Sequence, residues 1–541
     1  MGNNIKLLDK LLYACFLALS FRLVSINGEQ LTSCAQTPYP DTCNYYLTRD
    51  SMLLSSQEEK TFAFHDLALR VTMDHTVQVH RLVSSMDVSS FDGRARSAWS
   101  DCLELYEDTM HQLNRSMSSN TVNPRDSQTW LSATITNHVT CQNGFKELKV
   151  ESNLQRFPNL MLTNFSRLLS NSLAINKGYT ISSPPSSIHL HEESGNGGNR
   201  RLLADGFPSW VSASDRKLLQ STAAPKADLV VANDGSGDFK TISEAVAASA
   251  KRRSGDKRFV IYVKAGTYNE NVEIKRSMKN LMIVGDGKDA TVVTGSRNAK
   301  DGSTTFRSAT FAVMGAGFIA RDMTFQNTAG PQKHQAVALR SGSDFSVFYS
   351  CSFKGYQDTL YVYSQRQFYR ECDVYGTVDF IFGDAVVVLQ NCNIYARKPM
   401  SGKWNTVTAQ ARTDPNQNTG IIIHGCRITA ASDLKPVQGS VKTYLGRPWQ
   451  KYSRTVIMMS SLDGLIDPQG WLPWSGSFAL STLYYGEYMN TGSGASTSGR
   501  VKWPGYHVIT SASDARKFTV GNFLAGNSWI PATGVPFLVG L

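Results

Sequence analysis

The sequence predicts two folded units, an N-terminal all-α four-helix bundle and a C-terminal all-β right-handed parallel β-helix. Three observations carry this prediction. Apolar residues recur at helical spacing within 29–175, and the Ser-, Gly- and Pro-rich stretch 176–219 is too polar to bury a core. From residue 220 to 541, short runs of Val, Ile, Phe and Tyr alternate with Gly, Asn and Asp turns, as expected for many strands. A chain of 541 residues is also too long for one ordinary domain.

Residues 1–28 have the pattern of a signal peptide. Lys6 and Lys10 precede an apolar run over 11–20, which is too short to span a bilayer, and small or polar residues follow. A buried first helix is the alternative. Secretion predicts an extracellular protein with no membrane span, in an oxidising environment that permits disulfides. It also makes the Asn-x-Ser sequons at Asn114 and Asn164 usable for glycosylation.

The helical unit 29–175 shows apolar residues at i, i+3, i+4 and i+7 spacing over 102–113 and 162–173. Four such helices would form a bundle. The unit contains Cys34, Cys43, Cys102 and Cys141, which allow three disulfide pairings among which the spacing does not choose.

The linker 176–219 contains two dibasic clusters. Arg200 and Arg201 form the first, Arg216 and Lys217 the second, and each is followed by two leucines. Exposed, flexible basic sites are where processing proteases cut. The sequence therefore predicts that a processing protease separates the two units.

A repeated strand runs through the C-terminal unit. Each copy has two inward-type residues around one outward residue, and the copies begin 28, 21, 20, 34 and 34 residues apart. Irregular repeats of this length predict a solenoid of stacked parallel strands, because a β-sandwich does not explain an aligned column of cysteines. The copies begin at Met323, Cys351, Cys372, Cys392, Cys426 and Ser460.

Aligning two coils on Cys351 and Cys372 brings a pair of carboxylates together. Asp358 and Asp379 each lie seven residues after their cysteine, so they should occupy the same position on adjacent coils. Two carboxyl groups about one strand spacing apart repel, which separates them into a protonated acid and an ionised base or nucleophile. The alternative is a pair of turn aspartates that cap backbone groups.

The positive charge of the chain lies in the C-terminal unit. From Gln220 onward there are 35 Lys and Arg against 23 Asp and Glu, whereas the first 219 residues have 20 against 21. A basic secreted protein meets polyanions, and outside the cell an acidic polysaccharide is a better candidate than nucleic acid. The charge could also serve solubility alone.

The C-terminal unit resembles the plant-type pectin methylesterases over nearly its whole length. The resemblance implies ester hydrolysis on methylated pectin by a monomer without metal or cofactor. Five motifs in the same order carry it, and they begin at Gly266 (GTYNE), Gln335 (QAVAL), Gly355 (GYQDTL), Asp379 (DFIFG) and Leu445 (LGRPW).

The resemblance implies a role for each matching residue. Asp379 matches the nucleophile, Asp358 the general acid and base, and Arg447 the arginine that orients Asp379. Gln335 and Gln357 match the amides that stabilise the oxyanion. Thr305, Gln335, Arg447 and Trp449 match substrate-binding positions, and Cys372–Cys392 matches the disulfide, which leaves Cys351 and Cys426 as thiols.

The N-terminal unit resembles the pectin methylesterase inhibitors through the segment from Cys34 to Cys43, followed by Cys102 and Cys141. This resemblance implies the pairs Cys34–Cys43 and Cys102–Cys141, and a pro-region that keeps the enzyme silent until cleavage.

Other functions fit the sequence less well. A polygalacturonase would need a further aspartate pair with a catalytic His, and a pectate lyase a calcium-binding acidic cluster; neither arrangement is present in the sequence. A binding module on an inert scaffold would be expected to have lost a catalytic residue, whereas the whole set is present. A pro-region that inhibits other enzymes after release remains open.

Overall fold

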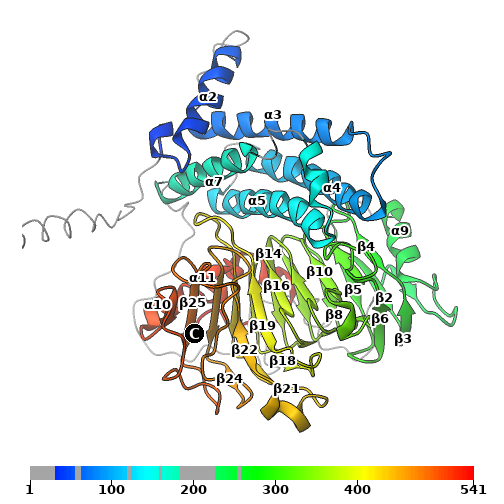
Figure 1. Cartoon of the computed structure of the whole chain (residues 1–541). Coiled ribbons are helices and arrows are strands. Elements are labelled where there is room, and N and C mark those ends of the chain that lie inside the picture. The colour runs from blue at the N-terminus through cyan, green and yellow to red at the C-terminus, as the bar shows by residue number, and fades with distance from the viewer. Residues whose placement is uncertain are drawn as a thin grey trace, which may run out of the picture.

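The computed structural model describes residues 31–54, 63–117, 123–157, 161, 163–182, 226–252 and 257–541 (Figure 1). The signal peptide expected over 1–28 lies outside the described residues. So do the basic clusters at Arg200, Arg201, Arg216 and Lys217.

The N-terminal unit is a bundle of four long helices. They are α3 (Phe64–Ser84), α4 (Gly93–Met117), α5 (Pro124–Glu147) and α7 (Phe165–Ser182), and each packs against two of the others. The start of α5 follows from its sequence, because the Asn123 side chain accepts from the Arg125 N–H and Pro124 occupies the first turn. The shorter elements are η1 (Cys34–Gln36), α2 (Pro40–Leu54) and η2 (Glu151–Arg156).

Two disulfides lie in this unit. Cys34 is bonded to Cys43, which ties η1 to α2, and Cys102 is bonded to Cys141, which ties α4 to α5. The helical unit extends further than the expected boundary at residue 175, because α7 continues to Ser182. The first residues of the expected linker are therefore helical.

The C-terminal unit is a parallel β-helix of three sheets, in which every strand pair is parallel. The eleven-stranded sheet comprises β1 (Leu229–Val231), β2 (Phe259–Val263), β5 (Leu281–Val284), β8 (Ile319–Arg321), β11 (Ser346–Tyr349), β14 (Arg366–Arg370), β17 (Val386–Gln390), β20 (Gly420–His424), β23 (Arg454–Met458), β25 (Tyr484–Tyr488) and β26 (Tyr506–Val508). The seven-stranded sheet comprises β4 (Val272–Ile274), β7 (Phe311–Val313), β10 (Leu339–Ser341), β13 (Leu360–Val362), β16 (Ile381–Gly383), β19 (Asn405–Gln410) and β22 (Thr443–Gly446). The eight-stranded sheet comprises β3 (Gly266–Asn269), β6 (Thr291–Gly295), β9 (Thr324–Asn327), β12 (Ser352–Lys354), β15 (Asp373–Gly376), β18 (Asn393–Ala396), β21 (Arg427–Ala430) and β24 (Ser461–Leu462).

The register of the eight-stranded sheet confirms the repeat found in the sequence. The second inward residues of the six copies pair in order, and all are fully buried. One coil therefore corresponds to one copy, and the cysteines stack in a column just before these strands. The paired residues are Phe325, Phe353, Val374, Ile394, Ile428 and Leu462.

The expected Cys372–Cys392 disulfide is wrong for this structure, in which both residues are buried thiols, as are Cys351 and Cys426. On adjacent in-register strands the Cβ atoms stay about 4.8 Å apart, farther than the ~3.8 Å typical of a disulfide. The thiols contact backbone oxygens instead: Cys372 Sγ lies 3.3 Å from the Phe348 oxygen, and Cys392 Sγ lies 3.5 Å from the Gln390 oxygen.

Short helices cover the end and one face of the β-helix. Helix α9 (Ile242–Arg252) packs on β1, β2 and β4. The C-terminal elements pack apolar residues on the eleven-stranded sheet. These are α10 (Ala512–Arg516), α11 (Val520–Phe523), η5 (Gly526–Ser528) and η6 (Ile530–Thr533), while η3 (Pro331–Lys333) and η4 (Lys435–Ser440) lie in loops.

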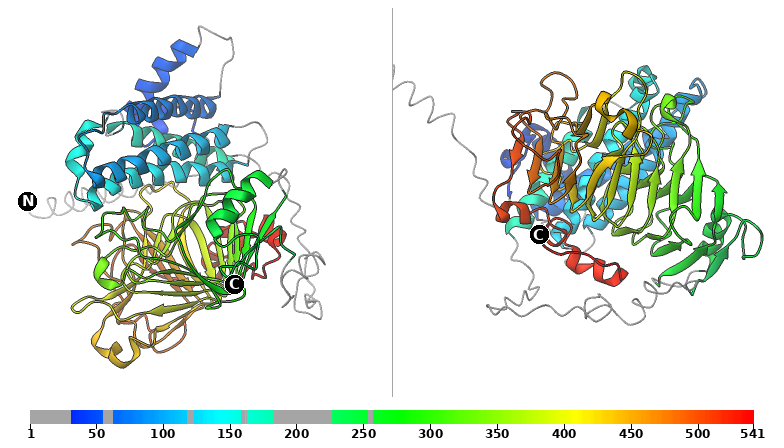
Figure 2. Two further views of the ribbon diagram at one scale, coloured as in Figure 1. Left: turned by 90° about the vertical axis from the view of Figure 1, so that its right-hand side faces the viewer. Right: turned by 90° about the horizontal axis from the view of Figure 1, so that it is seen from below.

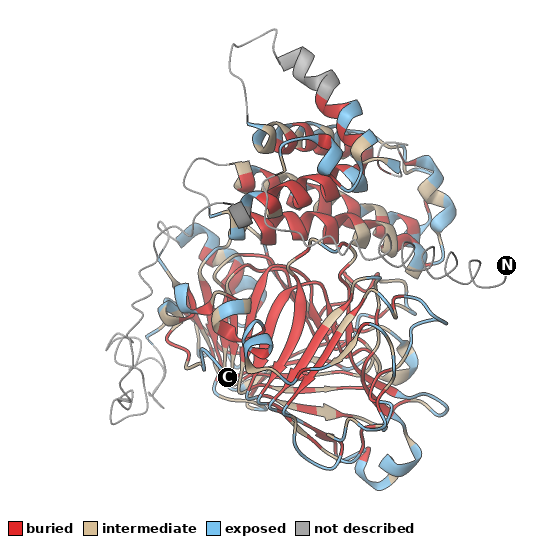
Figure 3. Ribbon diagram, turned by 90° about the vertical axis from the view of Figure 1, so that its left-hand side faces the viewer, coloured by how far each residue is buried: buried red, intermediate tan, exposed pale blue. Residues whose placement is uncertain are grey.

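The helical bundle lies across the seven-stranded sheet, with α5 next to the strands (Figures 1 and 2). One apolar cluster joins the two units, including Leu131 of α5, Phe306, and Tyr361 and Phe382 of the sheet. Figure 3, in which the ribbon is coloured by burial, shows buried residues both in the sheet and in the lower helices of the bundle. Within the described ranges, no helix is both long and apolar enough to span a bilayer.

Candidate active site

Asp379 is held by two partners, one on each of the next two coils. Arg447 binds it in a bidentate manner, with Nε 2.8 Å from Oδ1 and Nη2 2.6 Å from Oδ2. The Thr406 hydroxyl donates to Oδ1 at 2.6 Å, and the same oxygen of Thr406 accepts from the Asp379 N–H. A paired carboxylate with a fixed orientation is suited to act as a nucleophile.

Asp358 lies on the adjacent coil, as the cysteine alignment predicts. Its N–H donates to the Val378 oxygen, and Leu360 pairs with Ile381, which places Asp358 beside Asp379. Both aspartates have positive φ, +61° and +51°, in the left-handed region that Asp adopts more readily than most non-glycine residues. Burial, then Asp379 and Glu147, raise the pKa of Asp358 well above its ordinary value. The raised pKa favours the protonated form of Asp358, beside an Asp379 that is paired with Arg447.

The other residues expected at the site lie around this pair. Gln357 lines the cavity beside Arg447, and Gln335 lies one coil earlier, next to Ala336, whose N–H donates to the Gln357 oxygen. Trp449 packs against Phe382, with ring centroids 5.9 Å apart. The structure thus gathers on one face of the β-helix residues that lie more than a hundred positions apart in the sequence.

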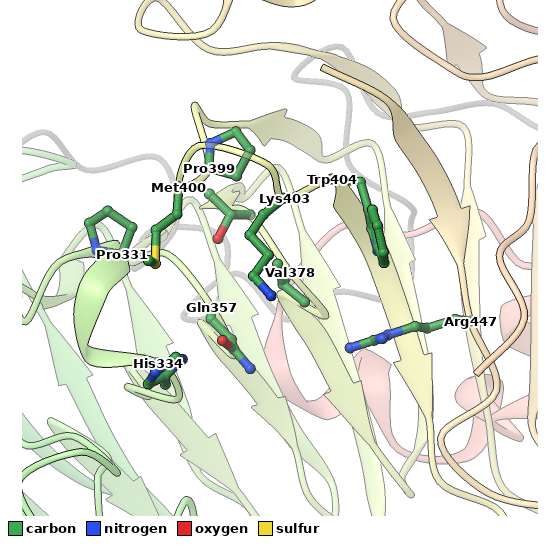
Figure 4. Close-up of a pocket in the computed structure, with 10 residues that line it drawn as sticks. Pro331, His334, Gln357, Val378, Pro399, Met400, Lys403, Trp404 and Arg447 are labelled. Carbon is green, nitrogen blue, oxygen red and sulfur yellow. The ribbon is translucent and has the colours of Figure 1, made fainter. Parts of the chain in front are cut away.

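A cavity of about 210 Å³ opens beside the aspartates. Figure 4 shows Gln357 and Arg447 at its floor, with Lys403 and Trp404 above them. Lys403 and Trp404 were not predicted from the sequence, since they lie outside the matching motifs in the turn between β18 and β19. Within the described part of the chain, no three His, Cys, Asp or Glu side chains are grouped so as to hold a metal ion.

Trp474 is a third site residue that the sequence did not indicate. The Arg447 guanidinium lies 4.2 Å from the centroid of its ring, and the ring remains partly exposed. Stacking on Trp474 and pairing with Asp379 together fix the plane of the guanidinium. A tryptophan in a loop 27 residues after Arg447 has no local pattern by which it could have been found.

Helix α5 covers the side of the cleft that contains Thr305 and Trp449. The Thr305 N–H donates to the Glu147 carboxylate at 3.0 Å, and Glu147 is close enough to Asp358 and Tyr361 to raise the pKa of each. Two narrow cavities that remain here are lined by Thr140 and Asn143 of α5 together with Tyr361 and Trp449. Thr305 and Trp449, both expected to bind substrate, therefore lie against the bundle. Thr305 binds Glu147, and Trp449 lines the narrow cavities next to α5.

Buried ion pairs join the two units. The most buried acids of the bundle, Asp101 and Asp108, bind Arg307 and Arg276 of the β-helix, each at 2.5 Å. Asp344 of the β-helix likewise accepts from Arg115 and from the Trp130 indole. Removing one partner of such a pair is costly, because it leaves the other charge buried.

The two sequons lie on the bundle. Asn114 is an exposed residue of α4, and Asn164 is half-buried just before α7, with its amide 3.3 Å from the Tyr46 hydroxyl. Their glycosylation stays a prediction.

Comparison with known proteins gives the same division of the chain. Residues 228–527 match the pectinesterase family, and residues 31–175 match the plant invertase/pectin methylesterase inhibitor family. The probable pectinesterase/pectinesterase inhibitor 6 of Arabidopsis thaliana is 55% identical over 534 residues, covering 95% of each chain. Pectinesterase 2 of Citrus sinensis is 55% identical over 526 residues, covering 97% of each chain.

Among solved structures, a pectin methylesterase from carrot is 61% identical to this chain. It matches with a TM-score of 0.58 over 59% of this chain and 100% of its own. The likeness therefore covers the β-helical unit with its aspartate pair, while the inhibitor-type match covers the bundle. The chain belongs to the pectinesterase family, as a pectin methylesterase whose catalytic β-helix follows an inhibitor-like helical unit.

Proposed function

We propose that the β-helical unit hydrolyses the C6 methyl esters of homogalacturonan to pectate and methanol, with Asp379 as nucleophile and Asp358 as general acid and base. The observation that carries the proposal is the asymmetry of the pair. Asp379 is bound by Arg447 through both oxygens, whereas the pKa of the adjacent, buried Asp358 is raised. One member can attack while the other donates a proton.

In the first half-reaction, an Asp379 oxygen attacks the ester carbonyl carbon at C6. The carbonyl oxygen becomes an oxyanion, to which the amides of Gln357 and Gln335 donate. When the tetrahedral intermediate collapses, the bond to the methoxy oxygen breaks. Asp358 gives its proton to that oxygen, so methanol leaves as a neutral molecule and an anhydride joins Asp379 to galacturonate.

In the second half-reaction, Asp358 is ionised and accepts a proton from water. The water oxygen attacks C6, the bond to Asp379 breaks, and the galacturonate carboxyl group is released. Asp379 leaves as a carboxylate, which Arg447 stabilises again. Asp358 regains its proton, and both aspartates return to their starting states without a metal or cofactor taking part.

The unit from Gln220 to the C-terminus tests this activity directly. Incubated with highly methylated pectin, it should release methanol while the length of the polymer stays constant. Gas chromatography measures the methanol, and viscometry measures the polymer. Falling viscosity without methanol would instead indicate cleavage of the glycosidic bonds and contradict the proposal.

The route to the cell wall is also proposed from the sequence. The segment 1–28 directs secretion, Asn114 and Asn164 are glycosylated, and a protease cuts at Arg200–Arg201 or Arg216–Lys217. The released enzyme acts as a monomer on pectin, and its excess positive charge attracts the polyanionic product.

We further propose that the bundle inhibits the enzyme until this cleavage. Helix α5 contacts Thr305 with Glu147 and lies over Trp449, so a pectin chain and α5 would compete for the same positions. The Glu147 carboxylate also lies near Asp358, in the region where a galacturonate carboxyl group would be produced.

The contact of Glu147 predicts that the bundle binds more weakly as pH rises. Burial, partly offset by the Thr305 hydrogen bond, raises the pKa of Glu147 to about 7, and burial raises that of Asp101 to about 6. Burial in the interface disfavours the ionised form of each acid, so the bundle binds most strongly when both acids are protonated. This added affinity is fully present below the ordinary pKa of Glu and is lost as pH rises through the raised pKa. We expect the dissociation constant of the separated bundle to rise roughly 10-fold or more between pH 5 and 7.5.

The variant Glu147→Gln should flatten this pH dependence, because an amide keeps an acceptor for the Thr305 N–H and does not ionise. Calorimetric titration of the cleaved parts at several pH values measures it. Glu151→Gln is the matched control, since Glu151 is exposed in η2. An equal pH slope for wild type and Glu147→Gln would contradict the assignment to Glu147.

A further inference from the structure

The two halves of helix α5 contact different parts of the β-helix. The C-terminal half, from Thr140 to Glu147, lines the narrow cavities of the cleft and contacts Thr305. The N-terminal half, from Gln128 to Ser132, instead contacts the loop between β19 and β20. This loop comprises residues 411–419 and is termed the docking loop. One helix thus makes two kinds of contact, and only that of its C-terminal half lies over the cleft.

The docking loop is recognised by the bundle through polar groups. The Asn418 amide donates to the Thr129 hydroxyl at 2.8 Å, and the side-chain oxygen of Asn418 accepts from the Ser132 hydroxyl at 3.2 Å. The main-chain oxygen of Asn416 accepts from the Gln128 amide at 2.8 Å. Further hydrogen bonds join Gln417 to the Ser132 oxygen, Ser170 of α7 to Asp414, and Lys177 of α7 to Asn416. These contacts have directions, so they distinguish one bundle surface from another better than apolar contacts do.

The β-helix itself holds the docking loop in this shape. The Arg412 guanidinium donates to the main-chain oxygens of Pro415 and Gln417. The Gln417 amide and the Thr419 hydroxyl both donate to Asp384, a buried residue just after β16. Because all of these bonds lie within the β-helical unit, the loop is preorganised, and little conformational entropy is lost when a bundle binds it.

The contacts of the docking loop are separate from the reacting groups. Residues 414–418 line none of the three cavities described above, and their hydrogen bonds to α5 do not involve the catalytic aspartates. A change in this part of the loop can therefore alter how tightly a bundle binds without altering the chemistry.

We propose that the docking loop is a recognition surface for a helical bundle of the inhibitor type, and that Asn418 selects a bundle with hydroxyl groups at the positions of Thr129 and Ser132. Recognition and inhibition are then divided along α5, because its N-terminal half binds the loop and its C-terminal half covers the cleft. Since the loop is preorganised, it persists after cleavage and accepts the bundle of a second copy of this chain. The proposal rests on the proposed inhibition only for its effect on activity, because binding needs no substrate.

Dissociation of the cleaved chain tests the role of Asn418. The full chain is folded intact with a protease site inserted at Arg216–Lys217, cut and diluted, and sedimentation velocity gives the dissociation constant of the two parts. Asn418→Ala should raise this constant about 10-fold or more, because it removes two hydrogen bonds across the interface. Asn522→Ala is the matched control and should leave the constant unchanged, since Asn522 is exposed in α11 and its amide donates to an oxygen of the same unit.

A double-mutant cycle tests whether Asn418 acts through its bond to α5. Thr129→Val keeps the shape of the side chain and should raise the dissociation constant about 5-fold, as expected for one lost hydrogen bond. Added to Asn418→Ala, it should cause no further loss, because the same bond is removed twice. Losses that simply multiply would show that the two residues act independently and would contradict recognition through this bond.

Three further results would overturn the proposal. The first is an equal dissociation constant for Asn418→Ala and Asn522→Ala. The second is a lower kcat for methanol release by fully dissociated Asn418→Ala, which would place Asn418 in the active site. The third concerns a second copy: isotopically heavy and light cleaved chains should exchange bundles in native mass spectrometry, and retention of the original pairs under dissociating conditions would exclude binding between copies.

Failure of this proposal is distinct from failure of the proposed inhibition. Weaker binding by Asn418→Ala, together with an uncut wild-type chain that is fully active, would support the recognition surface and contradict the inhibition. Unchanged binding by Asn418→Ala, together with an uncut chain that is silent, would do the reverse.

Discussion

Replacing Asp379 by Asn should lower kcat for methanol release by at least about 10⁴-fold, the size of effect seen when a catalytic nucleophile is removed. The amide nitrogen and oxygen are too weakly nucleophilic to form the anhydride. The fold should persist, because Asn keeps the size of the side chain and can still accept from Thr406 and Arg447. The assay is methanol release by the unit from Gln220, with circular dichroism to verify folding.

Asp373→Asn is the control for this variant. Asp373 lies at the start of β15 on the same coil, and its carboxylate binds Lys288 outside the cleft. The substitution removes the same charge without touching the site, so kcat should remain close to wild type. An Asp379→Asn enzyme that retained a tenth or more of its rate would assign the nucleophile elsewhere.

Cutting the chain between its two units should raise the rate of methanol release by about 10²- to 10³-fold. A tethered bundle has an effective concentration in the millimolar range, so even micromolar intrinsic affinity leaves only about 1 molecule in 10³ open. The apolar cluster shared by the two units and the Asp344–Arg115 ion pair both contribute to this affinity. A site for a sequence-specific protease inserted at Arg216–Lys217 allows the rate to be followed before and after cleavage.

The control for this experiment is the unmodified chain treated with the same protease. Dilution after cleavage should raise the rate further, because the bundle is then free to dissociate. A full-length chain as active as the cleaved one would show that α5 moves aside in solution and that the bundle does not inhibit.

The sequence predicted the architecture and the centre of the site for identifiable physical reasons. A β-helix places one residue of each coil above its counterpart in the next, so the cysteine column fixed the alignment that put Asp358 beside Asp379. The helical period of 29–175 likewise gave the bundle, although it did not show that α7 continues to Ser182.

What the sequence did not predict depends on contacts between distant segments. Glu147 acquires its environment only because α5 docks on the sheet next to Thr305. Trp474 and Lys403 come from loops, which follow no strand or helix period. The Cys372–Cys392 bond was wrong because adjacency of two coils guarantees proximity of the Cα atoms but not convergence of the Cβ atoms.

The most direct test of the two-aspartate mechanism is to trap the intermediate on Asp379. Hydroxylamine added during turnover attacks an anhydride, and attack at the enzyme carbonyl converts Asp379 to its hydroxamate, which peptide mass spectrometry locates. The mechanism predicts a hydroxamate at Asp379 that forms only when methylated pectin is present. Continued methanol release with no hydroxamate on either the enzyme or the pectin would show that water attacks the ester directly and would contradict the account.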